Sequence, residues 1–141
     1  MKDEKGFEME ESIQKYRKES DKHLEMFLVM YFWVRNLNNE KKIGNFLKDQ
    51  GYRYIAIYGA SYMGICLYEE LVKEDIKVIC FIDKSNIDQM MNIPVKKIED
   101  DLGSVDAIIV TSVYYFYEIE KELKRKLNCA ILSLSDIVYK L

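Results

Sequence analysis

The sequence predicts an α/β fold in which a five-stranded parallel sheet lies between two layers of helices. From about residue 52 onward, short apolar runs alternate with segments of helical period. Each run is apolar throughout, which is typical of parallel strands that helices cover on both faces. Because the segment before it is helical, the sequence predicts two parts: a helical N-terminal extension over residues 1–50 and an α/β domain over residues 51–141.

The N-terminal extension is expected to hold two helices. Residues 1–11 are polar and expected to be frayed, a long helix spans 12–37, and a shorter one runs from a cap at Asn38 or Asn39 to about Gly51. Residues spaced alternately three and four apart form a heptad seam along the long helix: Ile13, Tyr16, Ser20, His23, Phe27, Met30, Val34 and Leu37. Such a seam is typical of helices that pair, so we expect a homodimer through this helix, with His23 as an interface residue.

The α/β domain is expected to contain strands at 54–58, 77–82, 93–95, 107–111 and 130–134, with helices at 65–73, 114–127 and 135–141. Residues 85–92 are interpreted as a loop or a single helical turn. Pro94 cannot donate a ladder hydrogen bond, so the third strand belongs near an edge of the sheet. Right-handed crossovers then predict the strand order 3-2-1-4-5.

Composition and charge exclude several classes of protein. The 141 residues carry a net charge of −3, which argues against broad nucleic-acid binding. The longest apolar run, 26–34, is about half of the ~20 residues that a spanning helix needs, and the charged N-terminus is unlike a signal peptide. We therefore expect no transmembrane segment and a cytoplasmic location.

The cysteines and the single histidine predict no metal site. Cys66, Cys80 and Cys129 each lie in an apolar run, without a C-x-x-C motif or a histidine pair. Metal sites need clustered ligands, so these residues are expected to be buried, reduced thiols.

The strongest functional pattern is a glycine turn that follows the first strand and opens a helix. It consists of Gly59, Ala60, Ser61, Tyr62, Met63 and Gly64. Gly59 permits the turn, Gly64 permits close helix packing, and the backbone N–H groups at the helix start suit a phosphate. Asp83 ends the second strand, where an acidic residue commonly accepts hydrogen bonds from ribose hydroxyls. Together these features predict a Rossmann-like three-layer sandwich with a cofactor or nucleotide site at the turn.

The turn departs from the G-x-G-x-x-G pattern at its middle position, where Ser61 narrows the approach of a pyrophosphate. Its hydroxyl could still donate to a phosphate, and Tyr62 is bulky enough to lie over the turn. An alternative interpretation is that the glycines serve only turning and packing, and that Asp83 caps a following turn. Thr111 and Ser112, which end the fourth strand, either meet a phosphate or sugar or cap the next helix.

A second motif, Y-x-x-x-K at Tyr117 and Lys121, matches the catalytic pair of short-chain dehydrogenases. It lies on the helix after the fourth strand, where both side chains are expected to face outward. The chain also lacks the substrate domain or second βαβ half that dinucleotide oxidoreductases usually add. We therefore expect no catalytic residues, and a binding or regulatory module fits the length better than a complete enzyme.

Four segments carry a family resemblance: 54–64, 81–84, 93–95 and 106–112. They resemble a family of small bacterial Rossmann-like domains that occur beside glycosyltransferases and other surface-polysaccharide enzymes. They are also similar to the N-terminal domain of PglD-type sugar acetyltransferases. Over residues 40–141 the resemblance implies that Gly59, Ser61, Gly64 and Asp83 line a nucleotide or nucleotide-sugar site. The left-handed β-helix of those acetyltransferases is missing, so acetyl transfer is not implied.

Three functional hypotheses remain open from the sequence. The first is an accessory module that binds a nucleotide or nucleotide-sugar in surface-polysaccharide synthesis. The second is a small NAD(P)-dependent oxidoreductase that uses the same turn with Tyr117 and Lys121. The third is a ligand-free interaction module that dimerises through its N-terminal helix.

Overall fold

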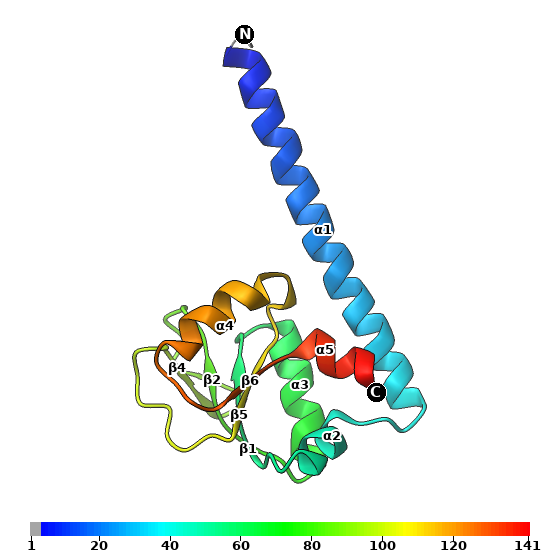
Figure 1. Ribbon diagram of the computed structural model, residues 1–141, viewed down its shortest axis with the longest axis vertical. Helices are drawn as coiled ribbons and strands as arrows, with labels where there is room; N and C mark the ends of the chain where they lie inside the picture. Colours follow the sequence, from blue (N-terminus) through cyan, green and yellow to red (C-terminus); the bar gives the residue numbers. More distant parts are fainter. Residues whose placement is uncertain (1–3) are drawn as a thin grey trace.

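A computed structural model describes residues 4–141 as one mostly parallel six-stranded sheet with helices on both sides (Figure 1). The order of the strands across the sheet is β3-β4-β2-β1-β5-β6. The strands are β1 Tyr54–Tyr58, β2 Lys77–Ile82, β3 Gln89–Met90, β4 Ile93–Lys96, β5 Ala107–Val110 and β6 Ala130–Ser133. The α/β class predicted from the sequence is therefore confirmed.

The predicted number of strands is wrong by one, because a short edge strand adds to the sheet. β3 pairs antiparallel with β4, through Gln89 with Pro94 and Met90 with Ile93. The two residues between them, Met91 and Asn92, both have positive φ angles, of 56° and 61°. A two-residue loop with this backbone is the usual hairpin connection. A strand of two residues leaves no period in the sequence, so residues 85–92 were predicted as loop or helical turn.

Helix bounds also differ from the predicted ones. The helices are α1 Glu4–Asn38, α2 Ile43–Asp49, α3 Tyr62–Lys73, α4 Phe116–Lys124 and α5 Leu134–Lys140, with a 3-10 turn η1 at Val113–Tyr115. Of the segment predicted to be frayed, residues 4–11 belong to α1, and residues 1–3 lie outside the described residues. α3 begins three residues earlier than predicted, so the second half of the glycine turn forms the first turn of a helix.

Alternate residues of the central strands face two separate cores, which makes the fold a three-layer sandwich. On one face, Ile55 and Ile57 pack with side chains of α1, α2, α3 and α5. On the other face, Ala56 and Tyr58 pack with the buried side of α4. The strands are thus covered on both faces, which explains why their sequences are apolar throughout.

The long helix α1 has two halves with different surroundings. Its C-terminal half packs against α5 and η1, with Val29 and Trp33 buried, whereas its N-terminal half extends away from the sheet (Figure 1). The buried carboxylate of Glu70 in α3 accepts hydrogen bonds from Trp33 Nε1 at 2.6 Å and from the Ile43 backbone N–H at 2.7 Å. One side chain therefore fastens α1 and α2 to α3.

The three cysteines differ in burial. Cys80 is fully buried and Cys129 is half-buried, and burial raises the pKa of both thiols. Cys66 is exposed on the outer side of α3, so the prediction that all three are buried is wrong at that position. The apolar run around Cys66 belongs to an amphipathic helix, of which only one side faces the sheet.

Candidate functional site

Both glycines of the turn are required by the packing of the chain itself. Gly59 has a φ of +118°, and a Cβ at this position would collide with the side-chain oxygen of Thr111. A Cβ on Gly64 would collide with the carbonyl oxygen of Gly59, because α3 packs directly on the turn. The glycine pattern that suggested a ligand site is therefore also needed to form this turn.

The carboxylate of Asp83 holds the turn against the end of β2. Its oxygens accept hydrogen bonds from the Ala60 N–H at 2.7 Å and from the Ser85 N–H at 2.9 Å. Partial burial by itself would raise the pKa of Asp83, but the hydrogen bonds it accepts outweigh this and lower the pKa below its ordinary value. Asp83 is thus an ionised anchor of the turn, and each oxygen keeps a lone pair for a further donor.

The middle of the turn is open to solvent. Ser61 is the N-cap residue of α3, and no capping hydrogen bond of its side chain is found within residues 4–141. Tyr62 is 86% exposed, so its ring points away and does not cover the turn, while Met63 is buried beneath it. Ser61 and Tyr62 at the start of α3 are therefore accessible, as a phosphate at a helix N-terminus would require.

The two hydroxyl residues after β5 have different roles. Thr111 is buried, and its hydroxyl donates to the carbonyl oxygen of Tyr58 at 2.8 Å, which joins the ends of β5 and β1. Ser112 precedes η1, is half-exposed and makes no side-chain capping bond in the described part of the chain. Of the two, Ser112 is the residue that can offer its hydroxyl to a ligand.

A crevice opens at the carboxyl ends of β1 and β2, beside the turn. Its two pockets, of about 440 and 360 Å³, share Tyr58, Asp83, Lys84 and Glu122. The first pocket also includes Gly59, Ser112, Tyr115, Glu118 and Ile119, and the second includes Ile82, Lys97, Ile98 and Glu99. This is the carboxyl edge of the parallel sheet, at which α/β proteins bind ligands. The strand order reverses between β1 and β5, and Gly59 and Ser112, which follow these two strands, both line the first pocket.

A third pocket, of about 270 Å³, lies on the other side of the turn, between it and α1. Lys22 and Met26 of α1 line it together with Ser61, Met63, Thr111, Ser112, Val113, Tyr114 and Tyr115. The Nζ atoms of Lys18 and Lys22 each lie 5.5 Å from the centre of the Tyr115 ring. This arrangement places positive charge next to the N-terminus of α3.

The two sides of the crevice differ in charge. On the α4 side, Glu118 and Glu122 lie near Asp83. Burial, together with the charges of Glu122 and Asp83, raises the pKa of the Tyr58 hydroxyl, which therefore stays protonated and can donate. An anionic group is favoured on the lysine side near α1, and groups that donate hydrogen bonds are favoured near Asp83 and Glu122.

Several residues of the crevice were not predicted from the sequence. Tyr115, Glu118, Ile119 and Glu122 follow the spacing of one helical face, so the period of α4 could have identified them once the turn was known. Lys84 directly follows Asp83, which is a further local signal. No local sequence signal identifies Lys22, because it reaches the crevice only through the packing of α1.

The Y-x-x-x-K motif lies outside the crevice. Tyr117 is 80% exposed on α4, and neither it nor Lys121 lines the three pockets described above. The crevice-facing residues of α4 are Glu118, Ile119 and Glu122, which lie on a different side of the helix. The motif thus places no proton donor next to the glycine turn.

Among residues 4–141, no group of three or more His, Cys, Asp or Glu side chains is arranged to hold a metal ion. None of the described helices is both long enough and apolar enough to cross a membrane. Comparison of the chain with protein-family models, curated proteins and solved structures finds no match. The interpretation of the crevice therefore depends on its own residues.

Proposed function

We propose that this chain is an accessory module that binds a nucleotide or a nucleotide-sugar and has no catalytic activity of its own. The observation that carries the proposal is the crevice at the carboxyl ends of β1 and β2, onto which the glycine turn opens. Its pockets have volumes in the range of small-molecule sites, and they combine apolar walls with a few polar groups.

The phosphates are proposed to lie over the start of α3, on the side of α1. The N–H groups of the first helical turn, the Ser61 hydroxyl and the Lys22 ammonium group come together there. Backbone N–H groups and a cation are the usual partners of phosphate at a helix N-terminus. The acidic side of the crevice would repel the phosphates and so favours this orientation.

The hydroxyl-bearing part of the ligand is proposed to face Asp83 and Glu122. Both carboxylates can accept hydrogen bonds from ribose or sugar hydroxyls, and the Tyr58 hydroxyl can donate one in return. Lys84 and Lys97 line the outer part of this region and leave it less negative than the α4 face alone.

One nucleotide unit with an attached sugar suits this site better than a complete dinucleotide. Ser61 stands where the middle glycine would allow the closest approach of a pyrophosphate. In addition, α1 leaves only about 270 Å³ on the side where the second nucleotide would extend. NAD(P) remains the alternative ligand, but an oxidoreductase based on Tyr117 receives no support from the position of that residue.

The proposed setting is surface-polysaccharide synthesis, and it comes from the family resemblance of the glycine turn, Asp83 and the strands around them. In that setting the module would present or sense a nucleotide-sugar for a partner enzyme. Because the resemblance implies no reaction, binding is the property to test first.

The test is a thermal-shift screen of the full chain with NAD, NADP, AMP, CoA and UDP-, GDP- and CDP-sugars. A ligand at about 100 times its Kd stabilises the folded state by about 2.7 kcal/mol, which raises Tm by several degrees. We expect a shift with one nucleotide class. The absence of a shift with every compound would contradict the proposal.

A matched pair of lysine variants locates the site. Lys22→Glu reverses the charge beside the proposed phosphate position and is expected to raise Kd about tenfold or more, which corresponds to about 1.4 kcal/mol. Lys77→Glu makes the same change at the opposite end of β2 and should leave Kd unchanged. Equal effects of the two variants would mean that the ligand responds only to net charge.

A further inference from the structure

We propose that the exposed side of α1 is a dimer interface, on which a second copy of α1 packs in the antiparallel direction. Of the eighteen large hydrophobic side chains that are exposed among residues 4–141, eleven lie on α1. They are Phe7, Met9, Ile13, Tyr16, Leu24, Phe27, Leu28, Tyr31, Phe32, Val34 and Leu37. So much apolar surface on one helix is unusual for a monomer and indicates a partner.

The exposed seam and the packed face of α1 are separate heptad stripes. The stripe that contacts the rest of the chain runs through Met26, Val29, Trp33 and Asn36. The seam through Phe27, Met30, Val34 and Leu37 follows it one residue later and is therefore turned by about 100°. Phe27, Val34 and Leu37 are exposed, whereas Met30 is partly buried and also touches the core. A partner helix is therefore proposed to cover the exposed residues of the seam, from Ile13 and Tyr16 to Phe27 and Val34.

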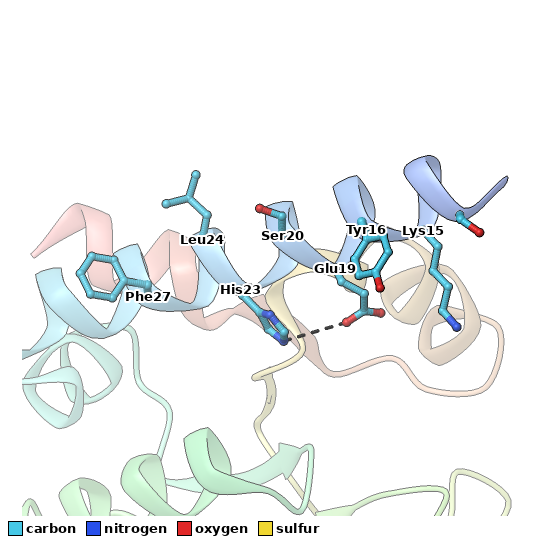
Figure 2. Close-up of a pocket in the computed structure, with 8 residues that line it drawn as sticks. Lys15, Tyr16, Glu19, Ser20, His23, Leu24 and Phe27 are labelled. Carbon is cyan, nitrogen blue, oxygen red and sulfur yellow. Dashed lines mark ion pairs between the residues drawn. The ribbon is translucent and has the colours of Figure 1, made fainter. Parts of the chain in front are cut away.

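An open groove of about 960 Å³ runs along this seam. Among the described residues it is lined by α1 alone, through Ser12, Lys15, Tyr16, Glu19, Ser20, His23, Leu24 and Phe27. Figure 2 shows that Ser20 and Leu24 point away from the domain, whereas His23 and Glu19 extend from α1 on the side toward the domain. One helix supplies one wall, so the groove lacks the opposing wall that a second helix would provide.

The order of residue types along the seam makes it complementary to its own reversed copy. When Ser20 of one copy is set opposite His23 of the second copy, Tyr16 comes opposite Phe27 and Ile13 opposite Met30. The only two polar residues between positions 13 and 37 of the seam then pair with each other at the two-fold axis. Apolar residues meet apolar residues on both sides of that pair.

A parallel pair is less favourable for two reasons. It would align the N-terminal ends of the two helices, where each carries Glu4, Glu8 and Glu11, and would place like charges side by side. It would also stack His23 on His23 and align the two helix dipoles, whereas the antiparallel pair opposes the dipoles.

The exposed apolar surface of α1 is close in size to one side of a standard dimer interface. The seam residues Met9, Ile13, Tyr16, Phe27 and Val34 are exposed by 66%, 47%, 78%, 64% and 51%, and Leu24 and Tyr31 flank them. If such side chains offer about 150–200 Å² each when free, these seven cover on the order of 700 Å² per copy. Standard dimer interfaces bury about 800 Å² per partner.

The charge of α1 favours a protein partner over an anionic membrane. The helix has six Lys or Arg residues and seven Asp or Glu residues. Helices that lie on anionic lipid surfaces are rich in Lys and Arg on their polar face, and α1 has no such excess.

The first test is the mass of the full chain in solution by size-exclusion chromatography with light scattering. We expect twice the chain mass of 16.8 kDa. Tyr16→Glu should produce a monomer, or raise the dimer Kd at least tenfold. Tyr117→Glu, the matched control, changes the same residue type at 80% exposure, against 78% for Tyr16, and should remain a dimer. Circular dichroism verifies that both variants keep their helices.

Three results of this test would overturn the proposal. The first is a monomeric wild-type chain at high micromolar concentration, and the second is a dimer Kd that Tyr16→Glu leaves unchanged. The third is a monomer that instead sediments with vesicles of anionic phospholipid, which would assign the exposed face of α1 to a membrane.

The second test determines helix direction by cysteine cross-linking, in a background that carries Cys66→Ser and Cys129→Ser. Tyr16→Cys and Phe27→Cys chains, when mixed and oxidised, should form a disulfide between the two variants, because the antiparallel register brings these positions together. Neither variant alone should cross-link efficiently. A strong cross-link in Phe27→Cys alone would indicate a parallel pair and overturn the antiparallel register.

Discussion

The glycine turn and the exposed side of α1 differ in how many of their side chains have partners within the chain. At the turn, the groups that first suggested a ligand already have hydrogen-bond partners within the chain. Asp83 accepts hydrogen bonds from Ala60 and Ser85, and Thr111 donates one to Tyr58. Along α1, large apolar side chains such as Tyr16 and Phe27 stay exposed.

This difference shows that a recognisable motif and an unsatisfied surface are separate kinds of functional signal. The residues of the motif hold the turn in place, and the ligand is proposed to use what remains accessible around them, chiefly Ser61, Ser112 and Lys22. The seam of α1 matches no chemical motif, yet its exposed apolar area points to a partner.

The largest expected effect concerns the attachment of α1 to the domain. Trp33→Ala removes a buried indole and its hydrogen bond to Glu70, and should lower the free energy of unfolding by about 3–5 kcal/mol. Tyr117→Ala, at a residue of α4 that is 80% exposed and lies outside the proposed dimer interface, should change it by less than about 1 kcal/mol. Urea denaturation measures both. A small effect of Trp33→Ala would mean that α1 is not part of the folded core.

The carboxylate of Glu70, which links α1 and α2 to α3, can be tested by a substitution that changes hydrogen bonding but hardly changes side-chain size. In Glu70→Gln, one side-chain oxygen is replaced by an NH₂ group that must face either Trp33 Nε1 or the Ile43 N–H, and both of these are donors. Because a buried donor is left without an acceptor, we expect a loss of about 1–3 kcal/mol. Glu69→Gln, on the exposed neighbouring residue, should be neutral in the same denaturation experiment.

At the turn, Gly59→Ala tests whether the glycine serves the fold. The positive φ and the collision with Thr111 should together cost about 1–3 kcal/mol in stability. The same change in a Thr111→Ala background should cost less, since the obstructing oxygen is gone. A double-mutant cycle measures this coupling, and strictly additive effects would show that backbone strain alone is responsible.

The smallest effect is the pH dependence that Asp83 contributes. The pKa of Asp83 is lower in the folded chain than in the unfolded chain, where it is about 3.9. The ionised side chain therefore stabilises the fold fully above the unfolded pKa, and this stabilisation is lost as the pH falls through the folded pKa. The stability difference between the wild type and Asp83→Asn should therefore be constant near pH 7 and shrink below about pH 4. A constant difference down to pH 2 would contradict the role of Asp83 as an ionised anchor.

The sequence predicted the features whose signals are local. Continuous apolar runs identified the strands that make up the parallel part of the sheet, and Gly59 with Gly64 located the turn. β3 was missed because Gln89–Met90 is too short to show a period. Lys22 was missed for a different reason: it reaches the turn only because Trp33 and Val29 set the position of α1. Tertiary packing of this kind leaves no pattern near the residue that it brings to a site.

The most direct test of the central claim is an amide NMR titration of the full chain with the nucleotide class that gives the largest thermal shift. We predict saturable chemical-shift changes that concentrate at residues 59–64, at Asp83 and Lys84, and at Ser112. The seam of α1 between Ile13 and Tyr16 should not respond. Millimolar ligand without changes at the turn, or with changes spread along α1, would contradict the proposal that this crevice binds a nucleotide.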